Sequence, residues 1–336
     1  MKFILILLFV ILIQSNWVLS QWVKSNNHVN GSVESLIMSD AGLLAGTYSF
    51  FGVKGMYRST DNGVNWNSYL FNNYNIFYLI KDNSNILCGS GHGLYISSNG
   101  GFNWNIPAPA YNSSVSGITV KGNFIFTSDN SDRISKSTNY GINWTISDFE
   151  DANELLALEN NIILTSYDST FVSTNNGINW IKTSTITFGR CLAKNSSGVY
   201  LGTPWALYKS TDQGFTWSQI FNKSTVSLIA NDSIVVSGGS DGIHVSGDNG
   251  ITWMNKNEGF LASMEVTALE IANNYIYAGI DSNVWRRPLS QIIGITMISQ
   301  IIPSRFDLSQ NYPNPFNPKT NIKIDIKETS QVKLTI

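Results

Sequence analysis

The chain has 336 residues, of which 43% are hydrophobic and 13% are charged, and its formal net charge is −2. A chain of this length forms one large domain or two ordinary ones. The nearly neutral balance offers no basic surface for nucleic acid or for an anionic membrane, so neither is expected as a partner.

The first 20 residues have the pattern of a secretory signal peptide. Lys2 precedes an apolar run from Phe3 to Ile13, and the next residues up to Ser20 are mostly small or polar. The run is shorter than the roughly 20 apolar residues that a membrane-spanning helix needs. We therefore expect residues 1–20 to direct export and to be cleaved near Ser20, with an uncleaved anchor as the alternative.

A motif of eight residues then occurs six times, and we call it the octet. The first copy is Ser59-Thr60-Asp61-Asn62-Gly63-Val64-Asn65-Trp66, and the six tryptophans follow one another at 36 to 40 residues. Side chains of Asp and Asn accept hydrogen bonds from nearby backbone N–H groups, and Gly adopts the positive φ of a tight turn. Each octet is therefore predicted to be a turn between two strands, with a buried indole behind it.

The acidic position of the octet is predicted to be structural. Asn99, Asn139 and Asn175 stand where the other three copies carry Asp, and Asn keeps the acceptor oxygen but cannot exchange a proton. No catalytic residue is therefore assigned to the octets. The predicted structural residues are Asp61, Gly63, Trp66, Asn99, Trp104, Asn139, Trp144, Asn175, Trp180, Asp212, Trp217, Asp248 and Trp253.

The octet resembles the Asp-box (BNR) repeat of sialidase-like, photosystem II assembly factor-like and sortilin-like β-propellers. Three short strands are predicted before each octet and one after it, as in Glu34–Met38, Leu43–Tyr48, Gly55–Ser59 and Trp66–Leu70. A seventh repeat begins at Val266 but lacks an octet, so Gln21–Lys24 is expected to supply its outer strand and close the ring. The prediction is an all-β, seven-bladed propeller over residues 21–290, with eight or six blades as alternatives.

The loops opposite the octets are predicted to hold the ligand-binding residues. Strands alternate in direction, so the loops between second and third strands and between blades share one face. Exposed aromatic side chains in loops are binding candidates, although loops between blades also bury aromatics. The candidates are Phe50, Phe51, Tyr74, Tyr111, Tyr167, Trp205 and Phe260.

Neither a metal nor a cofactor is expected. Cys88 and Cys191 lie in separate repeats, which favours two free thiols over a disulfide. The three histidines are isolated from one another in the sequence and show no metal-ligand spacing.

The C-terminal residues form a separate unit in this prediction. Residues 291–302 are a linker, and Leu308-Ser309-Gln310-Asn311-Tyr312-Pro313-Asn314-Pro315-Phe316-Asn317-Pro318 resembles the start of a type IX secretion C-terminal sorting domain. That resemblance implies a partial β-sandwich over residues 303–336, which the type IX secretion machinery recognises. Later strands of that family do not occur before Ile336, so the domain is expected to be truncated. The expected location is secreted or outer cell surface, through the periplasm.

Three classes of function are compatible with the pattern. A sialidase-type glycoside hydrolase needs three clustered arginines to hold a carboxylate, and the repeats contain only Arg58, Arg133, Arg190, Arg286 and Arg287. We therefore expect a monomeric, non-catalytic propeller that binds an extracellular saccharide, protein or peptide. A structural or adhesive surface protein is the third possibility.

Overall fold

The computed structural model describes residues 21–106, 114–129, 133–232, 234–260 and 264–293, and the backbone of short strands between 307 and 325. The chain divides into two compact units, Met1–Ile293 and Gly294–Ile336. The expected signal peptide and most of the expected linker lie outside the described residues.

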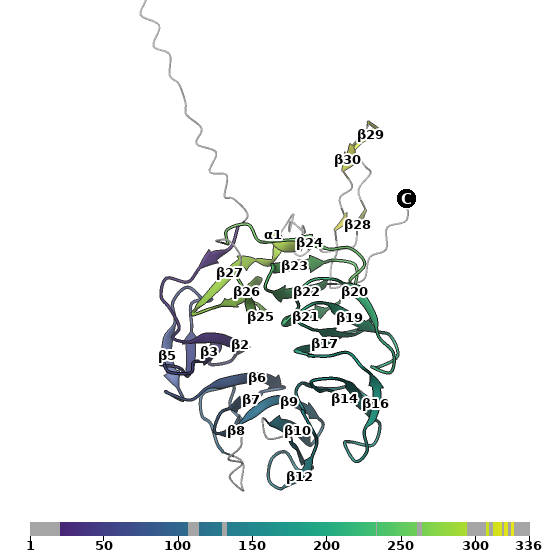
Figure 1. Ribbon diagram of the computed structural model, residues 1–336. Helices are drawn as coiled ribbons and strands as arrows, with labels where there is room; N and C mark the ends of the chain where they lie inside the picture. The colour runs from purple at the N-terminus through teal and green to yellow at the C-terminus, as the bar shows by residue number, and fades with distance from the viewer. Residues whose placement is uncertain are drawn as a thin grey trace, which may run out of the picture. The chain divides into compact units, whose positions relative to one another are not determined.

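The first unit is a closed ring of seven antiparallel sheets, which confirms the predicted seven-bladed propeller (Figure 1). Each sheet, or blade, begins with its innermost strand and ends at the rim. Blade 1 contains β2 (Ser32–Ser39), β3 (Gly42–Tyr48), β4 (Met56–Ser59) and β5 (Asn67–Leu70); blade 2 contains β6 (Ile76–Asp82), β7 (Asn85–Ser90) and β8 (Gly93–Ser97); blade 3 contains β9 (Val115–Lys121), β10 (Phe124–Asp129), β11 (Arg133–Ser137) and β12 (Trp144–Asp148).

The remaining blades follow the same order. In blade 2 the single bridge between Ile96 and Asn105 takes the place of a fourth strand. Blade 4 contains β13 (Leu155–Ala157), β14 (Ile162–Thr165), β15 (Thr170–Ser173) and β16 (Ile181–Ser184); blade 5 contains β17 (Cys191–Asn195), β18 (Gly198–Gly202), β19 (Leu207–Ser210) and β20 (Ser218–Phe221); blade 6 contains β21 (Ser227–Asn231), β22 (Ile234–Gly239), β23 (Gly242–Ser246) and β24 (Met254–Asn255); blade 7 contains β25 (Val266–Ala272), β26 (Tyr275–Ile280) and β27 (Asn283–Pro288).

The N-terminal segment closes the ring, as predicted. Strand β1 (Val23–Lys24) pairs with β27 and is the outer strand of blade 7. Beside it, Trp22 is buried, stacks on Phe260 with 5.0 Å between ring centroids, and donates its indole N–H to the Lys256 carbonyl at 2.6 Å. Because β1 pairs over only two residues, the packing of Trp22 holds this closure in place.

The hydrophobic core lies between neighbouring blades. The cluster around Val33, Leu36 and Tyr57 of blade 1 also contains Ala268 and Tyr277 of blade 7. Hydrogen bonds from side chains to the backbone cross the junctions between blades. For instance, the Thr267 hydroxyl donates to the Val33 carbonyl at 2.6 Å, across the closure.

The octets form one repeated hydrogen-bonded turn. In the first copy, the N–H of Gly63 donates to Ser59 Oγ at 2.8 Å, and the N–H of Asn65 donates to Asp61 Oδ1 at 2.9 Å. The equivalent pair of bonds is present in all six copies, whether the acceptor is Asp or Asn. The residue before the glycine also has positive φ, for example Asn62 at 57° and Gln213 at 62°, which sequence analysis did not predict.

The six octet tryptophans are not equally buried, which corrects the expectation of a buried indole in every copy. Only Trp66 is buried, at 1% exposure, and the other five are half-buried. Four of those, for instance Trp217, donate the indole N–H to the glycine carbonyl of their own octet at 3.0–3.2 Å. Trp66 instead lies beneath the N-terminal segment, because Asn27 accepts its backbone N–H at 2.8 Å.

The second unit contains β28 (Asp307–Leu308) paired with β31 (Ile324–Asp325), and β29 (Tyr312–Asn317) paired with β30 (Lys319–Asn321). These pairs fall within the predicted sorting domain, whose remaining residues lie outside the described part. In the first unit, the short helix α1 (Leu289–Ile293) follows β27. Among the described residues, no helix has the length and apolar character required to span a membrane.

Candidate functional site: the channel mouth and its aromatic clusters

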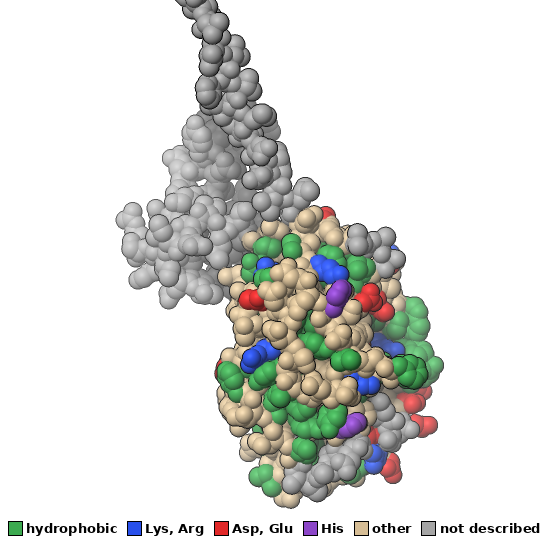
Figure 2. All heavy atoms as spheres, turned by 90° about the vertical axis from the view of Figure 1, so that its left-hand side faces the viewer, with side chains coloured by type: hydrophobic (Ala, Val, Ile, Leu, Met, Phe, Trp, Pro, Cys, Tyr) green, Lys and Arg blue, Asp and Glu red, His purple; other side chains and the backbone are tan. Residues whose placement is uncertain are grey.

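The antiparallel pairing gives the ring two distinct faces. The first residue of β2 pairs with the last of β3 (Ser32 with Tyr48), and Cys191 of β17 likewise pairs with Gly202. The octets follow the third strands and lie on the opposite face. We call the face where the innermost strands begin the mouth face. The side of the ring with β1 and β5 carries few, scattered charged side chains (Figure 2).

Of the seven predicted ligand-binding aromatics, four are exposed, two pack against other rings and one lies outside the described residues. Phe50 and Phe51 are 78% and 101% exposed, and Tyr167 and Trp205 are each 56% exposed. All four belong to loops between second and third strands, on the mouth face. The other three differ from them: Tyr74 packs on His92 at 4.2 Å, Phe260 lies against Trp22 and Trp285, and Tyr111 is outside the described residues.

The exposed aromatics belong to two clusters of rings. In the Trp205 cluster, Phe188 lies between Tyr167 and Trp205, with centroids at 4.0 and 5.1 Å. In the Phe51 cluster, rings follow one another from Phe77 through Tyr48 and Phe50 to Phe51, at 5.7, 5.3 and 6.1 Å. Tyr48 and Phe77 also line the central cavity, so this cluster leads from the cavity outward. Tyr48, Phe77 and Phe188 were not among the binding residues predicted from the sequence.

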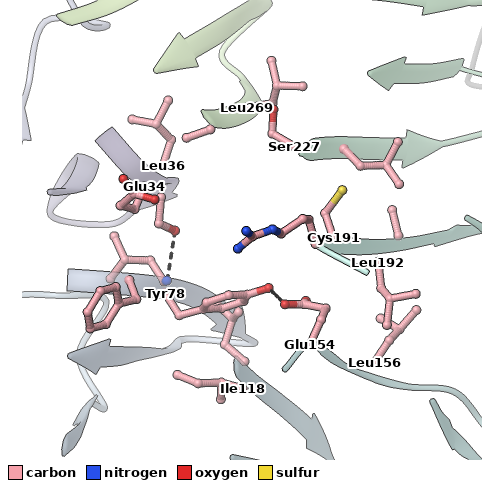
Figure 3. A pocket seen from close by; sticks show the side chains of 18 of the residues that line it. Glu34, Leu36, Tyr78, Ile118, Glu154, Leu156, Cys191, Leu192, Ser227 and Leu269 are labelled. Carbon is pink, nitrogen blue, oxygen red and sulfur yellow. Dashed lines mark hydrogen bonds between the residues drawn. The ribbon is translucent and has the colours of Figure 1, made fainter. Parts of the chain in front are cut away.

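The central cavity has a volume of about 1220 Å³ and is lined by the innermost strands (Figure 3). Its first level is a set of seven equivalent positions, one from each blade, which we call the mouth ring. In blades 1, 2, 3 and 7 this position is a β-bulge, and in blades 4, 5 and 6 its N–H donates to the end of the second strand. The mouth ring consists of Glu34, Phe77, Ser116, Asn153, Arg190, Val226 and Thr267.

A second level lies two residues further along each innermost strand, and we call it the collar. All seven of its members are leucine or isoleucine, and all line the cavity. The collar consists of Leu36, Leu79, Ile118, Leu155, Leu192, Leu228 and Leu269. In five of the six repeats with an octet, the collar residue precedes the octet serine by 18 or 19 residues. This spacing is the sequence signal that could have located the mouth ring.

A buried carboxyl group lies between the two levels. Glu154 of blade 4 is 6% exposed, and the hydroxyl of Tyr78 in blade 2 donates to its Oε2 (Figure 3). Burial raises the pKa of Glu154 well above its usual range, because the charged form loses its hydration. Burial, with a smaller effect of Glu154, raises the pKa of the nearby Cys191 thiol. A protonated thiol is a poor nucleophile, so Cys191 is not a catalytic candidate.

The charged groups of the mouth lie on opposite sides. Burial raises the pKa of Glu34, and the neighbouring carboxylate of Glu265 adds to this, while Ser32 and Arg190 act against it. Glu34 is on blade 1 and Glu265 is next to blade 7, whereas Arg190 is on blade 5. Arg190 is exposed, and its guanidinium forms no hydrogen bond or ion pair with any described residue. Arg190 is thus the free cation of the described part of the mouth.

The other arginines of the repeats lie elsewhere. Arg58 stacks over Tyr69 at 4.2 Å, Arg133 pairs with Asp129 at 2.9 Å, and Arg287 pairs with Glu258 at 2.7 Å. Arg286 donates to the Asn62 carbonyl at 2.8 Å. The part of the chain that the structure describes therefore lacks a three-arginine clamp at the mouth. Within it, no group of three or more His, Cys, Asp or Glu side chains is arranged to hold a metal ion.

Comparison with known proteins supports the fold. No protein-family model matches the chain, and no curated protein matches its sequence. The extracellular domain of BT4673 from B. thetaiotaomicron aligns with 80% of the chain at 14% identity and a TM-score of 0.65. The chain spans only 39% of that domain's length.

Two further solved structures have the same propeller fold. YCF48 bound to D1 peptide aligns with 80% of the chain and 96% of its own length, at 12% identity and a TM-score of 0.61. An ancestral GH74 enzyme aligns with 79% of the chain and 46% of its own length, at 17% identity and a TM-score of 0.61. At these identities the likeness establishes the propeller fold alone.

Proposed function

We propose that this chain is an extracellular, monomeric, non-catalytic β-propeller that binds a protein or peptide ligand on its mouth face. The observation that carries the proposal is the pair of exposed aromatic clusters at the mouth of a cavity that also holds a free arginine. Tryptophan, tyrosine and arginine are the residues most enriched at binding hot spots. Exposed apolar side chains that gather in clusters mark interaction sites on monomeric proteins more often than single ones do.

The neighbours add support of two kinds. One is an extracellular domain, and another is a propeller that was solved with a peptide bound. A saccharide is the alternative ligand, because exposed aromatic rings also stack on sugar rings. We favour a peptide, because the mouth carries charges of both signs. We further propose that the octets are Asp-box repeats, with the roles assigned to their Asx, Gly and Trp residues.

The export route is part of the proposal. Residues 1–20 are proposed to be a cleaved signal peptide, and residues 303–336 to be recognised by the type IX secretion machinery. In a host with that machinery, the full chain is expected at the cell surface or in the medium. A chain ending at residue 290 is expected to remain in the periplasm. If the full chain and the shortened chain are found in the same compartments in the same proportions, this export route is wrong.

The binding proposal is tested with peptide and glycan arrays probed by the full chain. Trp205→Ala is expected to weaken binding to an array hit by about tenfold or more, as for a hot-spot residue. Ile178→Ala is the matched control, because Ile178 is an exposed apolar residue on the octet face. Hits on glycans alone would favour the saccharide. No hit on either array would leave a structural or adhesive role.

A further inference from the structure

The two levels of the cavity differ in how much the residue type varies from blade to blade, although each level consists of structurally equivalent positions. At the collar, seven equivalent positions all carry leucine or isoleucine, as expected where each blade packs in the same manner. At the mouth ring, two residues away, the seven positions carry seven different side chains. Positions that the fold leaves free to vary from blade to blade are available to recognise an asymmetric ligand.

The charges of the mouth ring are arranged across the channel. In a closed ring of seven, blades 1 and 5 are three blades apart, which is the largest separation possible. Glu34 therefore lies across the channel from Arg190, and Figure 3 shows Glu34 and the neighbouring Cys191 on opposite sides of the cavity. Glu265 lies on the side of Glu34 and interacts with it. The mouth thus has an acidic side and a basic side.

These features define the class of ligand for the site proposed above. We propose that the mouth binds a peptide segment carrying a basic and an acidic side chain, with the basic group between Glu34 and Glu265 and the acidic group on Arg190. This inference rests on the proposed function and specifies its ligand.

The acidic side is suited to a second cation, because Glu34 and Glu265 form no ion pair within the described residues and only Arg190, from across the channel, acts on Glu34. The carboxylate of Glu265 contributes to the raised pKa of Glu34, since two like charges in proximity disfavour ionisation. A lysine or arginine between them removes this repulsion and gains charge-assisted hydrogen bonds.

The basic side is suited to a carboxylate. The guanidinium of Arg190 offers a planar pair of donors that matches a carboxylate in geometry. Phe188 lies two residues before Arg190, and Trp205 follows Pro204, which lines the cavity. Apolar residues of the peptide next to its acidic side chain would therefore contact the Trp205 cluster.

The apolar collar makes the mouth ring the more favourable level for the charged groups of the ligand. Moving a charged group from water toward these leucine and isoleucine side chains costs desolvation free energy. The ligand is thus held across the opening, in contact with the two sides and with the aromatic clusters. Such a segment corresponds to a loop or terminus of a partner protein, not to a small apolar molecule.

The test selects random 12-residue displayed peptides on the full chain and measures synthetic copies by calorimetry. Selected peptides are expected to contain at least one Lys or Arg and one Asp or Glu. Replacing either residue by Gln is expected to weaken binding by about ten- to a hundredfold, the usual effect of losing a charged hydrogen bond. In the Glu34→Gln variant, replacing the basic residue of the peptide should no longer weaken binding. In the Arg190→Gln variant, replacing its acidic residue should no longer weaken binding.

Two controls keep this result specific. Glu159→Gln, in an exposed turn on the octet face, and Lys24→Gln, in β1, should bind every peptide as the wild type does. Melting temperatures establish that each variant is folded. Bound peptides whose affinity does not depend on these charges would overturn the inference and leave the proposed function standing. The absence of any bound peptide would overturn the proposed function itself.

Discussion

Among single residues, the octet positions show what a repeated motif predicts and what it leaves open. The turn bonds could be predicted, because Asx acceptors and a glycine at fixed spacing have one favourable local geometry. The burial of each tryptophan could not, because it depends on what the rest of the chain places above that blade. Trp66 is covered by the N-terminal segment, whereas Trp217 remains half-exposed at the rim.

This difference leads to a prediction for the two tryptophans. Trp66→Ala is expected to lower the free energy of unfolding by about 3–5 kcal/mol, the usual cost of removing a buried large aromatic side chain. Trp217→Ala should cost less than half as much, because its ring is already half-exposed. Urea unfolding of the two variants measures this. Equal losses would show that the indoles act through the turn they share and not through burial.

Among the elements, the blades and their closure were predicted, whereas the mouth ring was not, and in blade 1 the collar-to-octet spacing that marks it elsewhere is longer. Six octets and one repeat without an octet indicated seven blades, and the missing outer strand indicated that Gln21–Lys24 would supply it. In blades 1, 2, 3 and 7 the mouth ring depends on β-bulges in the innermost strands. A bulge inserts one extra residue and redirects the side chains around it, and no turn residue marks its position in the sequence. Glu34 and Arg190 therefore appeared unrelated before the structure placed them together.

The junction of the first and last blades carries a buried carboxyl group that titrates near neutral pH. Glu270 of β25 accepts a hydrogen bond from the N–H of Met38 in β2 at 3.0 Å. Burial raises its pKa from an ordinary value near 4.5 to about 7, against the smaller opposing effects of that bond and of Lys81. The folded state thus binds more protons than the unfolded state between these values. Glu270 therefore makes the protein less stable as the pH rises from about 4.5 to 7.

Glu270→Gln removes this proton while retaining an acceptor for Met38. The variant is expected to be more stable than the wild type at pH 8, by about 1–3 kcal/mol, and to differ little at pH 4.5. Glu34 and Glu154 have pKa values raised in the same direction, so part of the pH dependence should remain. Urea midpoints at the two pH values measure the effect, with Glu159→Gln as the control. The prediction is wrong if the urea midpoint changes between pH 4.5 and pH 8 by the same amount in Glu270→Gln as in the wild type.

For the whole molecule, the placement of the arginines separates a binding propeller from a sialidase-type hydrolase. Among the described residues only Arg190 reaches the mouth, and the other four repeat arginines make contacts away from it. One guanidinium suffices to hold a carboxylate of a peptide, but a sialidase needs a cluster. The propeller fold itself is compatible with either role, since one solved neighbour is an enzyme and another binds a peptide.

We therefore expect the full chain to show no hydrolysis of aryl sialosides or of a panel of aryl glycosides, under conditions in which it binds peptides. The reason is that the described mouth lacks an arginine cluster, and that the carboxyl of Glu154 already accepts a hydrogen bond from Tyr78. Release of the aryl group, followed by absorbance, is the measurement, and Arg190→Gln is the matched variant. Turnover by the wild type that disappears in Arg190→Gln would place a catalytic site at the mouth and overturn the non-catalytic assignment. Turnover that persists in the variant would place one elsewhere in the ring.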